Sequence, residues 1–246
     1  MKLVERTLET LIALSKEKDG MSVSELAKKL DMPNSSTHRI LTCLKDSNFV
    51  IQSSESKKYR LGYKVLTLSS NISIENNFTH SAKPYMEELA KRIGKTVSLS
   101  VLEGESVVCL DYVESKDTSL FMVRTGFAMP AHATSAGKAI QAYMPIHQVQ
   151  QVYLKTKVEA LTDKTKVDFK DFLLELDEVR KNGYAVSDEE LQVGIQGVAC
   201  PIFDYNKKVV GSVAFTCLKT DNAITTENIN LLKETAMKIS VSIGNE

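Results

Sequence analysis

The segment from Ser22 to Asp46 constrains the fold of this chain more than any other part of it. Apolar positions recur with a helical period in two successive runs, namely Val23, Leu26, Ala27 and Leu30, and then Thr37, Ile40, Leu41 and Leu44. Ser22 stands three residues before Glu25, the spacing of a capping box, which marks the start of the first helix. Pro33 has no backbone N–H and therefore suits the first turn of a new helix. The pattern predicts two short helices joined by a tight turn.

The polar face of the second predicted helix, Asn34–Ser47, carries side chains that suit DNA. Short hydrogen-bonding groups and one guanidinium can contact base edges and phosphates in a major groove. The candidate DNA-binding residues of this segment are Ser22, Asn34, Ser35, Ser36, His38 and Arg39. The segment therefore predicts a helix-turn-helix with Asn34–Ser47 as its recognition helix.

Two short predicted strands follow the helices. Residues 49–51 and 58–61 have strand-like composition, and the polar segment between them is rich in turn-forming residues. With a further predicted helix that ends at Gly20, they indicate a winged helix-turn-helix. Lys57, Lys58 and Arg60 would then lie on the wing, near phosphates or the minor groove. The alternative is a solvated hairpin that contacts no partner.

Charge is distributed unevenly, although the net charge of the chain is zero. Residues 1–66 contain 12 lysines and arginines against 8 acidic residues, so the remainder carries an equal acidic excess. A small basic module on an acidic body is consistent with DNA contact at one end of the molecule.

Composition excludes several classes of protein. The 43% hydrophobic and 25% charged content is ordinary for a soluble globular protein. No apolar run approaches the roughly 18 residues of a membrane span, and the N-terminal sequence has no signal-peptide core, so we expect a cytoplasmic protein. The four cysteines are scattered without metal-binding spacing, which predicts free thiols in a reducing compartment and no metal site.

The chain divides into three predicted segments. Residues 1–62 form the DNA-binding domain, 63–77 a linker helix, and 78–246 an effector-binding and oligomerisation domain. The linker is only weakly helical, so we expect it to pack on another surface or another chain, a first indication of a dimer. In the third segment we predict helices at 79–93, 134–144, 146–155, 168–182 and 225–243, and strands at 96–102, 106–113, 119–124, 195–203 and 208–217. This order predicts an α+β body with a central, mostly antiparallel sheet.

Four stretches together resemble the IclR family of bacterial transcriptional regulators over nearly the whole chain. They are LDMPNSSTHRILTCL, YRLGYKVLTL, GFAMPAHATSAGKAIQAYM, and VSDEELQVGIQGVACPIFD followed by VVGSVAFT. The resemblance implies an N-terminal winged helix, a linker helix and a C-terminal GAF-like effector-binding domain. It also implies a regulator that binds a palindromic double-stranded DNA operator as a homodimer or a dimer of dimers. We expect a repressor, with an activator as the alternative. The effectors of such proteins are small molecules, typically carboxylates, and no cofactor is implied.

The third stretch has a physical meaning of its own. Thr134 is placed to cap a helix whose first turn is Ser135, Ala136 and Gly137, and the N–H groups of such a turn attract anions. An ordinary capped helix is the alternative, but the resemblance implies that this segment lines the ligand pocket. Lys138 follows directly, but a side chain at that position of a helix can face away from the ligand, so we do not count it among the effector-binding residues.

The fourth stretch adds further pocket candidates through the resemblance. It implies a pocket acid at Asp188 or Glu189, a strand position at Gly197 where some relatives have cysteine, and a hydroxyl at Thr216. Cys200, three residues after Gly197, is expected on the opposite face of the strand and in the core. Met122, Phe127 and Met129 remain open as pocket walls or plain core.

An enzyme and a protein-interaction module that does not bind DNA are the competing classes. Cysteine–histidine chemistry would need Cys109, Cys200 or Cys217 beside a histidine, and none stands in a nucleophile motif. His132 is more typical of a hydrogen-bonded structural histidine. Neither a phosphate-binding nor a dinucleotide-binding glycine pattern is present. We therefore expect a regulator without catalytic residues.

Overall fold

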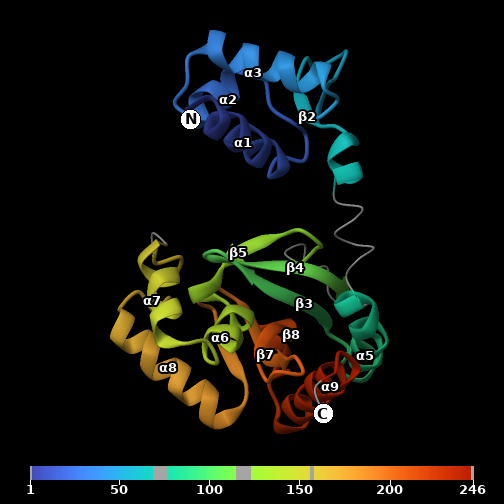
Figure 1. The fold of residues 1–246 in the computed structure, drawn as a ribbon, viewed down its shortest axis with the longest axis vertical. Coiled ribbons are helices and arrows are strands. Elements are labelled where there is room, and N and C mark those ends of the chain that lie inside the picture. The colour runs from blue at the N-terminus through green and yellow to red at the C-terminus, as the bar shows by residue number, and fades with distance from the viewer. Residues whose placement is uncertain (1, 69–76, 115–122, 156–157, 245–246) are drawn as a thin grey trace. The chain divides into compact units, whose positions relative to one another are not determined.

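The computed structural model describes residues 2–68, 77–114, 123–155 and 158–244 (Figure 1). The chain splits into two compact units, Met1–Asn76 and Asn77–Glu246. Most of the predicted linker and most of the predicted strand at 119–124 lie outside the described residues, as does Met122. The limits of the three predicted segments therefore stay predictions.

The first unit contains the predicted helix-turn-helix and hairpin. Its elements are α1 (Lys2–Ser15), α2 (Val23–Lys29), α3 (Asn34–Asp46) and the antiparallel strands β1 (Val50–Gln52) and β2 (Tyr59–Leu61). The capping box at the start of α2 is confirmed, since the Ser22 N–H donates to Glu25 Oε2 at 2.7 Å and the Glu25 N–H donates to Ser22 Oγ at 3.3 Å. Leu26, Leu41 and Val50 are completely buried at the centre of this unit. The hairpin beside the helices makes the unit a winged helix.

The second unit is built on a six-stranded antiparallel sheet. The strand order is β5-β4-β3-β8-β7-β6, with β3 (Thr96–Glu103), β4 (Ser106–Val113), β5 (Ala128–Pro130), β6 (Ala185–Asp188), β7 (Ile195–Phe203) and β8 (Val209–Leu218). The helices are α5 (Asn77–Ile93), α6 (Ser135–Gln141), α7 (Ile146–Lys155), α8 (Phe169–Asn182) and α9 (Thr226–Ser242), with the short 3-10 turns η1 (Ala131–Ala133) and η2 (Lys219–Asp221). Helices α5 and α9 lie together on one side of the unit, and α6, α7 and α8 on the other (Figure 1).

The two faces of the sheet differ in side-chain size. Toward α5 and α9 the strands present large apolar groups, which pack into one core cluster and include Val97, Leu99, Val198, Ile202, Val213 and Phe215. Side chains alternate along a strand, so the intervening positions face the other way. These are small residues, namely Ser98, Ser100, Gly197, Ala199, Ala214 and Thr216. The small face leaves room for the N-terminal end of α6 to approach the sheet.

Two strands were not predicted, and one helix is shorter than predicted. The edge strands β5 and β6 are only three and four residues long, too short to show a period in the sequence. The predicted helix at 134–144 begins after the N-cap Thr134 and ends at Gln141. By contrast β4, β7 and α7 have the predicted limits. Long periodic segments were therefore predicted well, and short segments at the edge of the sheet were not.

Candidate functional site

Helix α3 presents the predicted polar face to solvent. Asn34, Ser35, His38 and Arg39 are exposed and Ser36 is half-buried. Thr37, Ile40, Leu41 and Leu44, on the opposite side, are buried. The Arg39 guanidinium forms no ion pair with any described residue. The helix therefore holds its apolar side in the core of the unit and keeps its hydrogen-bonding side free for a ligand as large as DNA.

The wing and the start of α2 place the remaining predicted DNA-binding residues. Lys57 and Arg60 are exposed, whereas Lys58 is half-buried and its Nζ lies 3.5 Å from Glu25 Oε1. The backbone N–H and side chain of Ser22, followed by Lys58, lower the pKa of Glu25 and keep it ionised. The oxygen of Ser22 already accepts the hydrogen bond of the capping box. Ser22 therefore serves as a helix cap. Its hydroxyl group can still donate one hydrogen bond to a phosphate.

A polar hollow beside the wing adds a basic residue that the sequence did not single out. Lys18 and Asp19, after the end of α1, line it together with wing residues that include Lys58 and Arg60. Three of these four side chains are basic. Lys18 shows no motif, so only the folded unit brings it to the wing.

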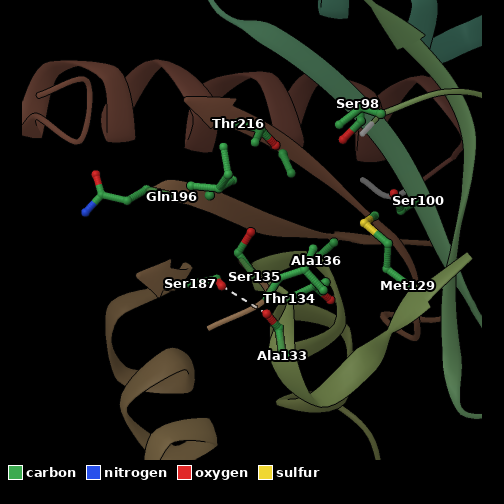
Figure 2. A pocket seen from close by; sticks show the side chains of 15 residues that line it. Ser98, Ser100, Met129, Ala133, Thr134, Ser135, Ala136, Ser187, Gln196 and Thr216 are labelled. Atoms are coloured by element: carbon green, nitrogen blue, oxygen red, sulfur yellow. Dashed lines mark hydrogen bonds between the residues drawn. The ribbon is translucent and has the colours of Figure 1, made fainter. Parts of the chain in front are cut away.

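The second unit contains a small cavity between the small-residue face of the sheet and the start of α6. Its space is about 50 Å³, room for about three or four waters or an organic molecule of a few heavy atoms. The lining residues are Ser98, Ser100, Val123, Met129, Ala133, Thr134, Ser135, Ala136, Ser187, Leu191, Ile195, Gln196, Gly197, Ala214 and Thr216. Figure 2 shows Ser98, Ser100 and Thr216 on the sheet side, across from Thr134, Ser135 and Ala136.

Five of the eight predicted effector-binding residues line this cavity, and they are Thr134, Ser135, Ala136, Gly197 and Thr216. Gly137 does not, because its Cα faces η1, where an added Cβ would lie 2.1 Å from the carbonyl oxygen of Ala131. Its N–H donates to Thr134 Oγ1 at 3.1 Å. Gly137 therefore allows a close helix–turn contact and is not part of the lining.

The predicted pocket acids are also displaced from the cavity lining. Ser187 of β6 faces the cavity, so its neighbour Asp188 points away. Asp188 instead accepts a hydrogen bond from Gln196 at 2.6 Å, and both Asp188 and Glu189 form ion pairs with Lys164 and Lys219. Neither acid is therefore among the lining residues, and the resemblance that suggested them did not show that Ser187 of β6 faces the cavity. Their part in effector binding stays a prediction.

Four polar lining residues were missed from the sequence, namely Ser98, Ser100, Ser187 and Gln196. A signal for two of them existed, since Ser98 and Ser100 alternate with Val97, Leu99 and Val101 in a strand that is buried on both faces. Met129 is confirmed as a wall residue, whereas Phe127 is not in the lining.

The cavity offers hydroxyl groups and one amide but no ionised side chain among its lining residues. Ser187 Oγ donates to the carbonyl oxygen of Ala133 at 3.0 Å (Figure 2), and Thr134 Oγ1 donates to that of Pro130 at 3.3 Å. A bound anion would take its hydrogen bonds from neutral donors such as Ser98, Ser135 and Thr216. Hydroxyl groups also accept hydrogen bonds, so these side chains can pair with carboxylate oxygens and with the hydroxyl groups of a ligand.

The environments of the three buried cysteines and of His132 indicate structural roles. Burial raises the pKa values of the Cys109 and Cys200 thiols to about 12 and that of Cys217 to about 11, which leaves them unreactive. Cys200 lies in the core cluster against α5 and α9, as predicted. His132 Nε2 lies 3.2 Å from the carbonyl oxygen of Glu159, so its structural role is confirmed. No cluster of ligating side chains suited to a metal ion occurs among the described residues.

A winged helix with an exposed polar recognition helix defines the chain as a DNA-binding regulator of transcription. Residues 3–54 match the IclR helix-turn-helix domain, and residues 72–241 match the C-terminal domain of the bacterial transcriptional regulator IclR. The chain belongs to the IclR family. The matched families are families of transcriptional regulators, not of enzymes. None of the helices in the described ranges is both long and apolar enough for a membrane span.

Individual relatives support the same assignment. The transcriptional repressor AllR of Escherichia coli K12 is 28% identical over 244 residues, which cover 98% of this chain and 90% of AllR. The crystal structure of IclR from Thermotoga maritima is 30% identical, with a TM-score of 0.74 and 99% coverage of both chains. An IclR homologue from Microbacterium hydrocarbonoxydans, solved in complex with 4-hydroxybenzoate, has the same fold at a TM-score of 0.79, with 20% identity and coverage of 98% of this chain and 97% of the homologue.

Proposed function

We propose that this chain is a ligand-responsive repressor that binds a palindromic operator through its winged helix and senses a small organic acid in the second unit. The observation that carries the proposal is the cavity at the start of α6, which five residues chosen from the sequence line together. The relative AllR is described as a repressor, and the Microbacterium homologue was crystallised with an aromatic acid. Both descriptions agree with the proposed function.

The proposed assembly is a homodimer or a dimer of dimers. One side of α1 exposes four large apolar residues, Leu3, Val4, Leu8 and Ile12, each more than half exposed. A soluble protein usually covers such an apolar helix face with a partner. A palindromic operator needs two recognition helices, which a second copy of this chain supplies.

The proposed mechanism is linkage between two sites. An acid in the cavity binds one packing of the second unit more tightly than another, and this difference in affinity shifts the equilibrium between the packings. The linker segments transmit the shift to the two DNA-binding units. Two half-sites are read together only when the separation of the recognition helices matches about 34 Å, one turn of DNA, or a multiple of it.

Gel retardation with the DNA upstream of the protein's own gene tests the proposal. We expect a retarded complex whose log affinity falls with log salt by about 0.9 for each phosphate contacted. Addition of the effector is expected to dissociate the protein–DNA complex. A thermal-shift screen of small keto and hydroxy acids identifies the effector independently. Absence of retardation at low salt, with and without every acid that binds, would refute the function.

A further inference from the structure

Helix α6 carries a completely buried cation directly after the part that lines the cavity. The side chain of Lys138 has 0% exposure, and its Nζ lies 2.7 Å from Glu175 Oε1 and 2.7 Å from Glu190 Oε1. The second oxygen of Glu175 lies 3.2 Å from Lys166 Nζ. Two cations and two carboxylates therefore form a charge-balanced group, which is what burial of an ammonium requires.

Glu190 depends on Lys138 more than Glu175 does. Its Oε2 is buried and has no hydrogen-bond partner among the described residues. Its Oε1 receives, besides the ammonium, only a long hydrogen bond of 3.4 Å from the Asp188 N–H. Burial raises the pKa of Glu190, and Lys138 opposes that effect. Without the ion pair, the buried Glu190 carboxylate would keep only this one long hydrogen bond from the described residues.

The position of Glu190 connects this ion pair to the cavity. Glu190 lies in the turn between β6 and β7, and the next residue, Leu191, lines the cavity, as do Ile195 and Gln196 beyond the turn. On the other side, Ser135 and Ala136 of α6 line the cavity only two or three residues before Lys138. The Lys138–Glu190 pair, which is not itself part of the lining, thus connects two walls of the same cavity.

We propose that Lys138 is a positioning residue of the effector site, which holds the 189–194 turn and its Leu191 against α6 through Glu190. The inference rests on the proposed function, because it takes the cavity as the effector site. The turn has other attachments, since Thr162 Oγ1 and Thr165 Oγ1 donate to the carbonyl oxygens of Glu189 and Glu190 at 2.8 and 2.7 Å. Loss of the ion pair is therefore expected to loosen the turn without unfolding the domain.

The test variant is Glu190→Gln in the full-length chain. It keeps the shape of the side chain and the Lys138–Glu175 pair but removes the charge that Lys138 holds in the turn. The matched control is Glu178→Gln, which breaks the exposed pair between Lys181 and Glu178 on α8. Hydrogen exchange without ligand is expected to accelerate in Glu190→Gln more strongly in the 189–194 turn than in the central strands β3 and β8, and to stay unchanged in the control.

Ligand binding provides the second readout, with pyruvate as the probe. We expect Glu190→Gln to weaken pyruvate binding by about tenfold in a domain that stays folded, with a melting temperature lowered by the loss of a buried ion pair. Equal exchange in the turn of both variants, or an unchanged pyruvate affinity in Glu190→Gln, would overturn the positioning role. A second outcome separates the two proposals. If exchange in the turn accelerates in Glu190→Gln but the wild type binds no acid, the Lys138–Glu190 contact between the two walls is supported and the effector site is refuted.

Discussion

At the scale of single residues, the cavity depends on one glycine. A Cβ on Gly197 would lie 2.8 Å from Ser135 Oγ and 3.7 Å from the carbonyl oxygen of Phe215. The strand can accept a methyl group there only if the Ser135 hydroxyl turns away. Gly197 therefore fixes the position of a hydrogen-bond donor on the opposite wall.

We predict that Gly197→Ala weakens binding of the effector acid by about tenfold, because it moves the Ser135 hydroxyl and fills part of the cavity. The free energy of unfolding is expected to change by less than about 1 kcal/mol, since Ser135 can adopt another rotamer. Isothermal titration calorimetry and urea unfolding measure the two quantities. Val241→Ala, at a position on α9 that is 57% exposed, is the control. Equal affinities of the two variants would contradict the role of Gly197.

The cluster of Asp188, Glu189, Lys164 and Lys219 makes a pH-dependent contribution to stability. Hydrogen bonds from Gln196 and then Lys164 lower the pKa of Asp188 to about 2, and those from Lys164 and then Lys219 lower that of Glu189 to about 2. Both folded-state pKa values lie below the ordinary ones. The stabilisation is therefore present above the ordinary values and is lost as the pH falls through about 2.

We predict that the double variant Lys164→Ala and Lys219→Ala has a lower melting temperature than wild type at neutral pH. The difference is expected to persist down to about pH 5 and to shrink steadily as the pH falls through about 2, below which both carboxylates are protonated in either protein. Thermal unfolding followed by circular dichroism over this range measures it. A difference that is independent of pH would contradict the assignment of these ion pairs.

At the scale of elements, the sequence predicted those whose side chains repeat with a clear period. The alternation in β3 and the apolar stripes of α8 and α9 suffice to place these elements, and Asp168 and Thr225 mark the helix starts with side-chain caps. Which side chains of a short strand point toward the cavity could not be predicted. The resemblance suggested Asp188 as a pocket residue, whereas Ser187 of the unpredicted strand β6 is the residue that lines the cavity. The role of Lys138 depends on how α6 is rotated against α8, which no local pattern specifies.

The recognition helix and the wing are expected to contribute differently to DNA binding. We predict that Arg39→Ala costs roughly 1–3 kcal/mol on the operator and relaxes specificity at one base pair, if the guanidinium reads a base. Lys57→Ala is expected to weaken binding equally on all sequences and to reduce the salt slope by about 0.9, because it removes one phosphate contact. Fluorescence anisotropy at several salt concentrations separates these outcomes. Identical behaviour of the two variants would contradict the assignment of α3 as the reading helix.

At the scale of the whole molecule, the proposed function belongs to a pair of chains. A single winged helix contacts one half-site, and specificity for a palindrome arises when two are held at a fixed distance. In the proposed mechanism, the cavity in the second unit acts on DNA only through that distance. The proposed mechanism therefore makes the spacing of the half-sites the quantity that the effector controls.

This spacing gives a prediction that needs no knowledge of the effector. Insertion of 5 base pairs between the half-sites of the operator turns one half-site by about half a helical turn, so the second recognition helix faces the wrong side of the DNA. We expect the affinity to fall to that of a single half-site. A 10 base-pair insertion restores the facing but adds one helical turn to the distance, so it is expected to lower the affinity less than the 5 base-pair insertion does. Gel retardation on synthetic operators measures both, with a single half-site as the reference. Full affinity after the 5 base-pair insertion would show that the two DNA-binding units are not held in register, and would refute control of their spacing as the mechanism.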